Sequence, residues 1–293
     1  MPELPEVETV RRGLERQLNN AFEIDRVEVL RARAIAAPAD VDQFRAGLIG
    51  CLVGTWSRRG KYLMAELSRG GQAAGHWGVH LRMTGQFLWL DQPRDPCRHT
   101  RVRCWNRQGQ ELRFIDVRSF GQMWFIPSGQ ACSSVMTGLQ KLGPEPFSSG
   151  FNGPYLQQKL KGSVRPIKAA LLDQALVAGV GNIYADESLF NAGVAPPAPQ
   201  RQPQPRRARA AMPITDRGAR DQHRLRWHHL QRLPRSQRHQ WQLRRRRLGL
   251  SPQRPTLPPL RPTDPAPAPG RTQQPLVPQL PALNRCRRMV IVP

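Results

Sequence analysis

The chain has 293 residues, which is enough for two domains, and carries a formal net charge of +24. An excess of positive charge of this size favours a polyanionic partner such as a nucleic acid. No apolar run in the chain is long enough to span a membrane, and its beginning lacks the basic and apolar segments of a secretory signal. Its five cysteines are scattered without a CxxC pair, which predicts reduced thiols and a cytoplasmic location.

The positive charge is concentrated in the last third of the chain. Residues 197–293 contain 21 arginines and three aspartates but no lysine or glutamate, so this segment carries +18 of the net charge. It also holds 18 of the 29 prolines, and a composition rich in proline, arginine and glutamine predicts disorder. A basic DNA-binding arm is one interpretation. Because such arms normally mix lysine with arginine, this tail calls for a further explanation.

The residues before the tail predict an α+β fold. Apolar side chains recur at helical spacing after Pro5, and strand-like segments follow at 24–29, 52–67, 78–90, 101–106 and 111–115, with a short helix or turn at 41–47. Punctuation by Gly, Pro and Asp predicts an antiparallel β-sandwich or barrel with flanking helices. Helices are expected at 139–143, 154–162, 165–174 and 185–192. We therefore expect three parts: a catalytic β-sandwich domain (1–143), a partial helical DNA-binding domain (144–196) and the tail (197–293).

The first residues carry a possible nucleophile. If Met1 is removed, Pro2 presents a secondary amine with a pKa of about 8, which can attack an electrophilic carbon and form an iminium adduct. Glu3 follows immediately and can act as a general acid or base. The alternative interpretation is an ordinary helix start, with Pro5 in the first turn and acidic residues at the positive end of the helix dipole. Both interpretations can hold together.

The string MPELPEVETVRRGL resembles the amino terminus of the formamidopyrimidine-DNA glycosylase family, which excises oxidised purines such as 8-oxoguanine. Leu4 favours this branch over endonuclease VIII, which usually has a glycine there. The resemblance implies that Pro2 is the nucleophile, that Glu3 protonates the sugar ring oxygen and that Glu6 is a supporting carboxylate. It also implies a bifunctional glycosylase and abasic-site lyase of base-excision repair. Such an enzyme is expected as a monomer in the bacterial cytosol or nucleoid, acting on double-stranded DNA with oxidised purines or abasic sites.

Further motifs extend the resemblance. Lys61 lies in RGKYL, whose lysine in the family contacts phosphate and assists strand cleavage; a solvated lysine is the alternative. Removing a base from the helix leaves a hole, and inserted side chains offset the lost stacking. Met83 in HLRMTG, with Arg118 and Phe120 in DVRSFG, matches the family residues that fill this hole, and His80 matches a phosphate contact. Ordinary sheet packing is the alternative for Met83 and Phe120, and a surface position for Arg118.

The segment LLDQALVAGVGNIYADESLF resembles the helix–two-turn–helix motif of the family. Backbone amides of such a glycine-rich turn, with a helix N-terminus behind them, predict a phosphate-binding site. The resemblance implies that Asn182 contacts a phosphate beside the lesion. It also implies that Lys168 contacts DNA or the lesion, and that Tyr184 makes a further DNA contact.

The family pattern stops at Ala195-Pro196-Pro197. Family members continue with more helices, a lesion-recognition loop and a four-cysteine zinc finger, whereas the tail contains only Cys286. Back-translation with GC-rich codons and a one-base shift gives strings resembling the missing family segments, in the family's order. They are TTFSDFR from 228–235, GQPCRRC from 254–261, and SSHWCPSCQR followed by a stop codon from 273–284. We therefore interpret the tail as the product of a one-base frameshift near Pro196, either real or from sequencing.

This interpretation predicts no bound metal and no cofactor, because a structural zinc site needs its thiolates. The histidines of the tail are by-products of the shifted frame. A truncated helical domain is also expected to expose four apolar side chains, Leu171, Leu172, Leu189 and Phe190, and to be poorly soluble. Two alternatives to an active purine glycosylase stay open: a catalytically inactive basic DNA-binding remnant, and an endonuclease VIII-like glycosylase for oxidised pyrimidines.

Overall fold

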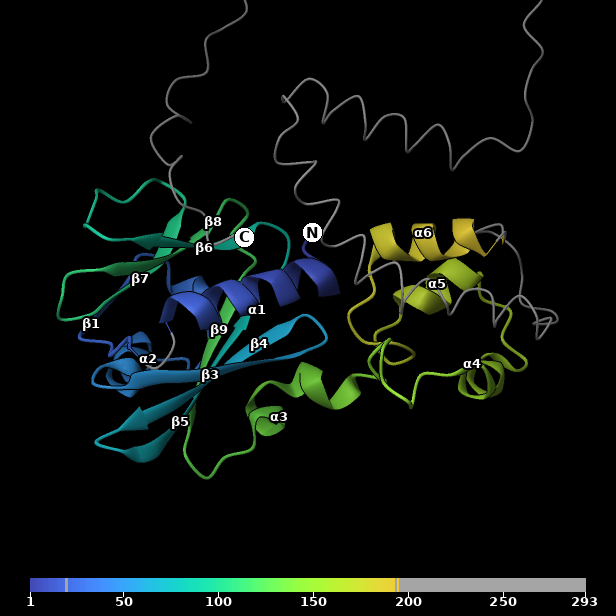
Figure 1. Cartoon of the computed structure of the whole chain (residues 1–293), viewed down its shortest axis with the longest axis horizontal. Helices are drawn as coiled ribbons and strands as arrows, with labels where there is room; N and C mark the ends of the chain where they lie inside the picture. Colours follow the sequence, from blue (N-terminus) through green and yellow to red (C-terminus); the bar gives the residue numbers. More distant parts are fainter. Residues whose placement is uncertain (19–20, 193, 195–293) are drawn as a thin grey trace, which may run out of the picture. The chain divides into compact units, whose positions relative to one another are not determined.

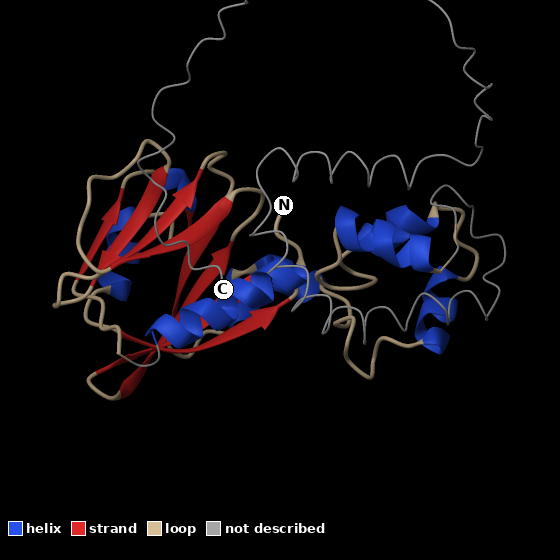
Figure 2. Cartoon of the chain, turned by 45° about the horizontal axis from the view of Figure 1, so that its top comes forward, coloured by secondary structure: helices blue, strands red, loops and turns tan. Residues whose placement is uncertain are grey.

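The computed structural model describes residues 1–18, 21–192 and 194. These residues form a β-sandwich followed by a series of short helices (Figure 1), with the strands gathered into two sheets (Figure 2). The predicted α+β class and the sandwich are confirmed. No helix within the described ranges is both long and apolar enough to cross a membrane.

The two sheets of the sandwich contain four and five strands. The four-stranded sheet has the order β1 (Arg26–Val29), β7 (Thr100–Trp105), β8 (Glu111–Asp116) and β6 (Gly85–Leu90). The five-stranded sheet has the order β2 (Ile35–Ala37), β9 (Gln122–Pro127), β5 (Gln72–His80), β4 (Tyr62–Arg69) and β3 (Leu52–Arg59). All neighbouring strands are antiparallel except β2 and β9, which are parallel.

Helices precede, interrupt and follow the sandwich. They are α1 (Leu4–Leu18), the 3-10 turn η1 (Ala32–Ala34), α2 (Val41–Leu48), α3 (Cys132–Val135), the 3-10 turn η2 (Thr137–Lys141), α4 (Gly153–Leu160), α5 (Ile167–Leu172) and α6 (Asn182–Asn191). Helix α1 buries Val7, Val10, Leu14 and Leu18, which lie on one face at helical spacing. That face packs against β3, so the chain's first residues are held beside the sandwich.

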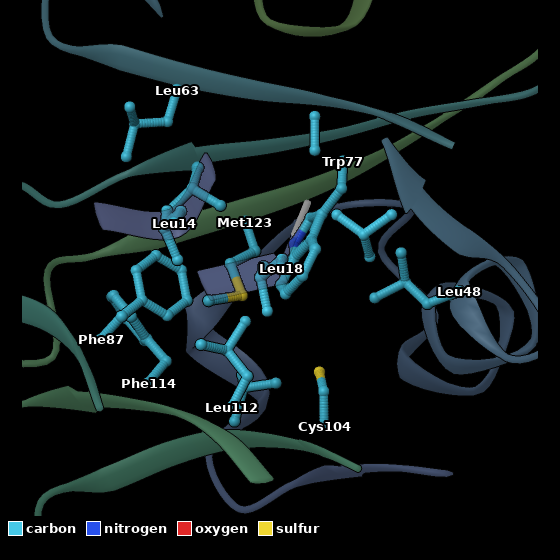
Figure 3. Packing of buried hydrophobic residues seen from close by; sticks show 14 of the residues in the cluster. Leu14, Leu18, Leu48, Leu63, Trp77, Phe87, Cys104, Leu112, Phe114 and Met123 are labelled. Atoms are coloured by element: carbon cyan, nitrogen blue, oxygen red, sulfur yellow. The ribbon is translucent and has the colours of Figure 1, made fainter. Parts of the chain in front are cut away.

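Separate apolar cores support the two folded parts. The sandwich core contains side chains from both sheets and from α1, including Leu14, Trp77, Phe87 and Phe114 (Figure 3). The helical segment has its own core, made of Phe151, Leu156, Leu160, Ala170, Leu176 and Val177. A core in the helical segment that is separate from the sandwich core is compatible with the expected division near residue 143, which stays a prediction.

Several expectations need correction. The strand expected at 78–90 is two strands, β5 and β6, because the turn at 81–84 carries the chain from the five-stranded sheet to the four-stranded one. Strands β2 and β9 were not predicted. Helix α6 begins at Asn182, three residues before the expected start. Leu189 was expected to be exposed, yet it is buried in the structure, whereas Phe190 is 67% exposed. The predicted tail lies outside the described residues.

Candidate catalytic and DNA-binding site

The Glu3 carboxylate lies at the N-terminus of α6. It is 2% exposed and accepts hydrogen bonds from the backbone N–H groups of Gly181 (3.0 Å), Ile183 (2.8 Å) and Tyr184 (3.1 Å). Amides at the start of a helix have no partner within the helix, and the helix dipole favours negative charge there. The candidate acid is therefore positioned by a helix that begins almost 180 residues further along the chain.

This arrangement changes the interpretation of the glycine-rich turn. The turn was expected to bind a phosphate through its amides, but Glu3 already occupies three of them, so that interpretation is wrong for these groups. A Cβ atom at Gly181 would lie 2.6 Å from Oε1 of Glu3, and one at Gly179 would lie 2.6 Å from Cδ1 of Leu4. Gly179 also has φ of +87°, a conformation that favours glycine. The glycines thus allow the first residues of the chain to approach the turn closely.

Glu6 lies next to Glu3. Its carboxylate accepts hydrogen bonds from the Glu3 backbone N–H at 2.9 Å and from the Tyr184 hydroxyl at 3.2 Å. Burial raises the pKa of Glu6, and the negative charge of Glu3 acts in the same direction, while these hydrogen bonds oppose the rise. Tyr184, predicted as a DNA contact, therefore directs its hydroxyl toward a catalytic candidate.

Lys61 lies in the turn between β3 and β4 and is 7% exposed. Its Nζ donates a hydrogen bond to the Val180 carbonyl at 3.0 Å. Burial lowers the pKa of Lys61, whereas the charges of Glu3 and Glu6 raise it. The alternative of a solvated surface lysine is therefore wrong. Lys61 is instead a buried cation whose charge is balanced by the two candidate carboxylates.

Pro2 precedes Glu3 directly and is partly exposed, while Met1 is 53% exposed. The Pro2 nitrogen becomes an amine only when Met1 is removed. The Glu3 carboxylate is fixed by amides at the start of α6, and Glu6 is bound by the Glu3 amide, so the residues that follow Pro2 are held in place.

Met83, Arg118 and Phe120 lie on two turns at one end of the sandwich. Met83 is 38% exposed and Phe120 is 44% exposed, so sheet packing does not account for either side chain. Nη1 of Arg118 lies 3.0 Å from Sδ of Met83, which brings the two turns into contact. Exposed apolar side chains on adjacent turns suit insertion into a base stack better than they suit a core.

His80, at the end of β5, is buried. Its Nδ1 accepts a hydrogen bond from the Arg82 backbone N–H at 3.0 Å, which leaves Nε2 as the nitrogen that carries the proton. Burial, together with the charges of Arg82 and Lys61, lowers the pKa of His80 to about 3. Any phosphate contact by His80 at neutral pH would therefore use an uncharged N–H donor.

The two remaining predicted contacts belong to the helical segment. Lys168 pairs with Asp186 of α6, with Nζ 2.8 Å from a carboxylate oxygen, and both side chains are partly exposed. The side chain of Asn182 is exposed at the first residue of α6. Both residues are open to solvent, and their DNA contacts stay predictions.

Two arginines that no sequence motif indicated lie beside the Phe120 turn. Arg101 donates from Nε to the Asp116 carbonyl at 2.9 Å, and the Arg33 guanidinium lies 5.8 Å from the centre of the Phe120 ring. Neither arginine belongs to a motif that we quoted, and only their positive charge could have suggested a role. Strand pairing brings them to this turn.

No metal centre emerges from the described part of the chain, where no group of three or more His, Cys, Asp or Glu side chains could hold an ion. The four cysteines in that part are free thiols, and Cys51 and Cys104 are buried. A four-cysteine zinc site would need the tail, which contains only Cys286. The cysteines present therefore do not fit the zinc site of the family pattern.

Comparisons with known proteins agree with this geometry. The sequence profile of the formamidopyrimidine-DNA glycosylase N-terminal domain matches residues 1–123, and that of the formamidopyrimidine-DNA glycosylase H2TH domain matches residues 142–214. A formamidopyrimidine-DNA glycosylase of Parasynechococcus marenigrum (strain WH8102) is 64% identical over 199 residues, which cover 68% of this chain and 70% of that protein. One from Prochlorococcus marinus (strain MIT 9313) is 59% identical over 212 residues, covering 69% of this chain and 72% of that protein.

A solved structure also matches. The Lactococcus lactis Fpg in complex with DNA containing an abasic site superposes with a TM-score of 0.65 at 31% identity, covering 74% of this chain and 78% of that one. The chain therefore belongs to the formamidopyrimidine-DNA glycosylase family.

Proposed function

We propose that this DNA-repair glycosylase removes oxidised purines from double-stranded DNA through the Pro2 amine and then cleaves the strand at the resulting abasic site. The observation that carries the proposal is the position of Glu3. Its carboxylate is buried and bound by three amides at the N-terminus of α6, while Glu6 and the Lys61 ammonium are held around it. Buried ionisable groups fixed around a potential nucleophile are what a site for acid–base and covalent catalysis requires.

The proposed chemistry begins with the lone pair of the Pro2 nitrogen. This nitrogen bonds to C1′ of the extruded nucleotide, and the damaged base leaves with the electrons of the glycosidic bond. The base takes up a proton from water. The Pro2 nitrogen releases its N–H proton to the Glu3 carboxylate, and Glu3 passes this proton to O4′, so that the C1′–O4′ bond opens and the iminium forms. Loss of a proton from C2′ then permits elimination of the 3′ phosphate, and a second elimination removes the 5′ phosphate. No external oxidant or reductant is consumed.

Lys61 and Glu6 would support these steps from fixed positions. Burial lowers the pKa of Lys61, and the negative charges of Glu3 and Glu6 oppose this change by favouring the ammonium form. An incoming phosphate would supply further negative charge and favour the ammonium form. We therefore assign Lys61 to the phosphate contact that assists strand cleavage.

Outside the catalytic group, we assign DNA contacts to exposed side chains and to the buried His80. We propose that Met83, Arg118 and Phe120 fill the hole left by the extruded base, because their side chains lie on adjoining exposed turns. His80 would meet a phosphate as a neutral donor. Asn182 and Lys168 would contact the backbone from the helical segment.

The frameshift interpretation belongs to the same proposal. A family glycosylase without its four-cysteine finger lacks some of its contacts with DNA, so we propose that this chain binds its lesion weakly. We also propose that the chain is zinc-free, monomeric and cytoplasmic. Resequencing the nucleotides that encode Pro196 tests this directly. A reading frame confirmed as it stands in independent isolates would favour a genuine basic arm.

Borohydride trapping of the full chain on a duplex containing 8-oxoguanine tests the catalytic proposal. We expect a covalent complex that is lost in Glu3→Gln and reduced in Pro2→Gly, where a primary amine replaces the secondary one. Asp42→Asn, at an exposed position on α2, is the matched control and should trap normally. Stronger trapping on an oxidised pyrimidine would instead indicate an endonuclease VIII-like enzyme. Salt-sensitive binding that ignores the lesion, without trapping, would indicate an inactive remnant.

Mass spectrometry of the same protein is the second test. The mechanism requires a free Pro2 amine, so Met1 must be absent from the active species. Incision of oxidised DNA by protein that retains Met1, or that is acetylated at its terminus, would refute the assignment of Pro2.

A further inference from the structure

We infer that the buried carboxylate of Asp116 is a positioning residue that joins two turns into one preformed wedge for entering DNA. The first turn, 81–84, connects β5 to β6 and carries Met83; the second, 117–121, connects β8 to β9 and carries Arg118 and Phe120. We call these the wedge turns. The inference deepens the proposed function, on which it rests, by naming what holds the three inserted side chains together.

Asp116 is fully buried at the end of β8, and both of its carboxylate oxygens are used. Oδ1 accepts a hydrogen bond from the Thr84 hydroxyl and one from the Arg118 backbone N–H at 3.1 Å. Oδ2 accepts from the Gly121 backbone N–H at 2.6 Å. The side chain thus closes the second wedge turn near both of its ends and attaches it to the first.

Thr84 completes the junction. Its Oγ1 also accepts a hydrogen bond from the Arg118 backbone N–H at 3.0 Å, so the same amide contacts both side chains of the pair. An ionised carboxylate only accepts hydrogen bonds, and here it meets one hydroxyl and two amides, which are all donors. An asparagine would have to present its N–H₂ group to one of these donors, so it cannot reproduce the arrangement.

Backbone strain falls on the same two turns. Among the described residues, two that are not glycine have positive φ: Arg82 at 53° and Ser119 at 54°. Each lies in a different wedge turn, beside a residue proposed to enter the DNA. A left-handed conformation at such residues persists only where surrounding contacts impose it. The Asp116–Thr84 junction provides those contacts for both turns.

Both turns also close on the same aromatic ring. A Cβ atom at Gly85 would lie 2.8 Å from Cζ of Phe114, and one at Gly121 would lie 2.6 Å from the same atom. The two chain segments therefore pack directly over Phe114 with no room for a larger residue. The wedge has a rigid base in the sandwich core.

A preformed wedge matters because extruding a paired base costs stacking and pairing energy. Side chains already held in place give up little further conformational freedom when they insert, so more of their contact energy offsets that cost. The junction should therefore affect a base that must be extracted from a duplex. It should matter little where the lesion is already unpaired.

The test compares borohydride trapping rates of the full chain on 8-oxoguanine paired with cytosine and on the same lesion inside an unpaired bubble. We expect Asp116→Asn and Thr84→Val to slow trapping on the paired lesion by about tenfold or more, and on the bubble by less than about twofold. The double variant should be no worse than Asp116→Asn alone, because both changes break one junction. Equal slowing on the two substrates, or none on either, would overturn the inference.

Amide hydrogen exchange provides a readout that needs no activity. In Asp116→Asn, exchange should rise in both wedge turns, including 81–84, while the α6 amides that bind Glu3 keep their protection. A rise confined to 117–121 would show that Asp116 does not join the turns, and a rise across the whole sandwich would show a merely structural role. Absence of trapping by the unmodified chain on any substrate would refute the proposed function, and hydrogen exchange would still decide whether the junction exists.

Discussion

The buried His80 predicts a specific dependence of stability on pH. Burial and the charges of Arg82 and Lys61 lower its pKa from 6.5 to about 3. Its Nδ1 accepts the Arg82 backbone N–H, which requires the unprotonated nitrogen. In His80→Asn the side-chain oxygen takes approximately the place of Nδ1 and keeps this acceptor, while the titrating group is removed.

Proton binding in the two states fixes the sign and size of the effect. As the pH falls through 6.5, His80 gains a proton in the unfolded chain, whereas the folded protein keeps it neutral until the pH approaches 3. The unfolded state binds more protons in this window, so the free energy of unfolding falls with falling pH. Between pH 7 and pH 5 the loss is about 2 kcal/mol, because one pK unit corresponds to about 1.4 kcal/mol. His80→Asn should lack this part of the pH dependence.

Urea unfolding at pH 7, 6 and 5, followed by tryptophan fluorescence, measures the effect. Trp56 and Trp77 lie in the sandwich core and report its unfolding. His99→Asn is the comparison variant, because His99 is partly exposed and its removal should change the slope much less. If the wild type and His80→Asn lose the same stability between pH 7 and pH 5, His80 is not held neutral and the reasoning is wrong.

Further predictions concern the catalytic group and its surroundings. In Gly181→Ala, the added methyl group would displace the Glu3 carboxylate from the three amides that bind it. We expect the trapping rate to fall roughly a hundredfold, with little change in DNA affinity. An unchanged trapping rate would refute the role of this glycine. The Lys168–Asp186 pair is partly exposed, so Asp186→Asn should change the free energy of unfolding by less than about 1 kcal/mol in chemical denaturation. If Lys168 contacts phosphate, Lys168→Ala should reduce the magnitude of the slope of log DNA-binding constant against log salt concentration by about 1, as measured by fluorescence anisotropy. An unchanged slope would show that Lys168 does not contact DNA phosphate.

The elements recovered from sequence are those with a strong local pattern. Helix α1 follows from apolar residues at helical spacing, and β3 and β4 follow from alternation on both sides of a Gly–Lys turn. The first half of β5, QAAGHW, contains Ala and Gly in place of β-branched residues, so its sequence does not mark a strand. Pairing with β4 and β9 makes it one. Of these two partners, β4 is adjacent in the sequence, whereas β9 is distant from β5.

The residues of the candidate site also differ in whether a local sequence pattern can identify them. Residue types in short motifs identified Glu3, Lys61 and Met83, because each motif is contiguous. The function of the glycine-rich turn was not recoverable locally: its amides resemble a phosphate site until a carboxylate from the other end of the described chain is known to occupy them. Similarly, nothing near Asp116 in the sequence shows that it contacts Thr84, 32 residues earlier.

The residues that hold the catalytic group all lie before position 196. The contacts that hold Glu3, Glu6 and Lys61 come from residues up to 184, before the pattern ends. The binding energy of a structural zinc is part of the folding energy of its own module, so the loss of that module does not remove the sandwich core. Contacts made by residues after 196 can increase the affinity for DNA, but they are not needed to assemble the catalytic group. Replacing the residues after 196 with the C-terminal segment typical of the family should therefore lower the DNA concentration required for trapping much more than it raises the trapping rate at saturating DNA.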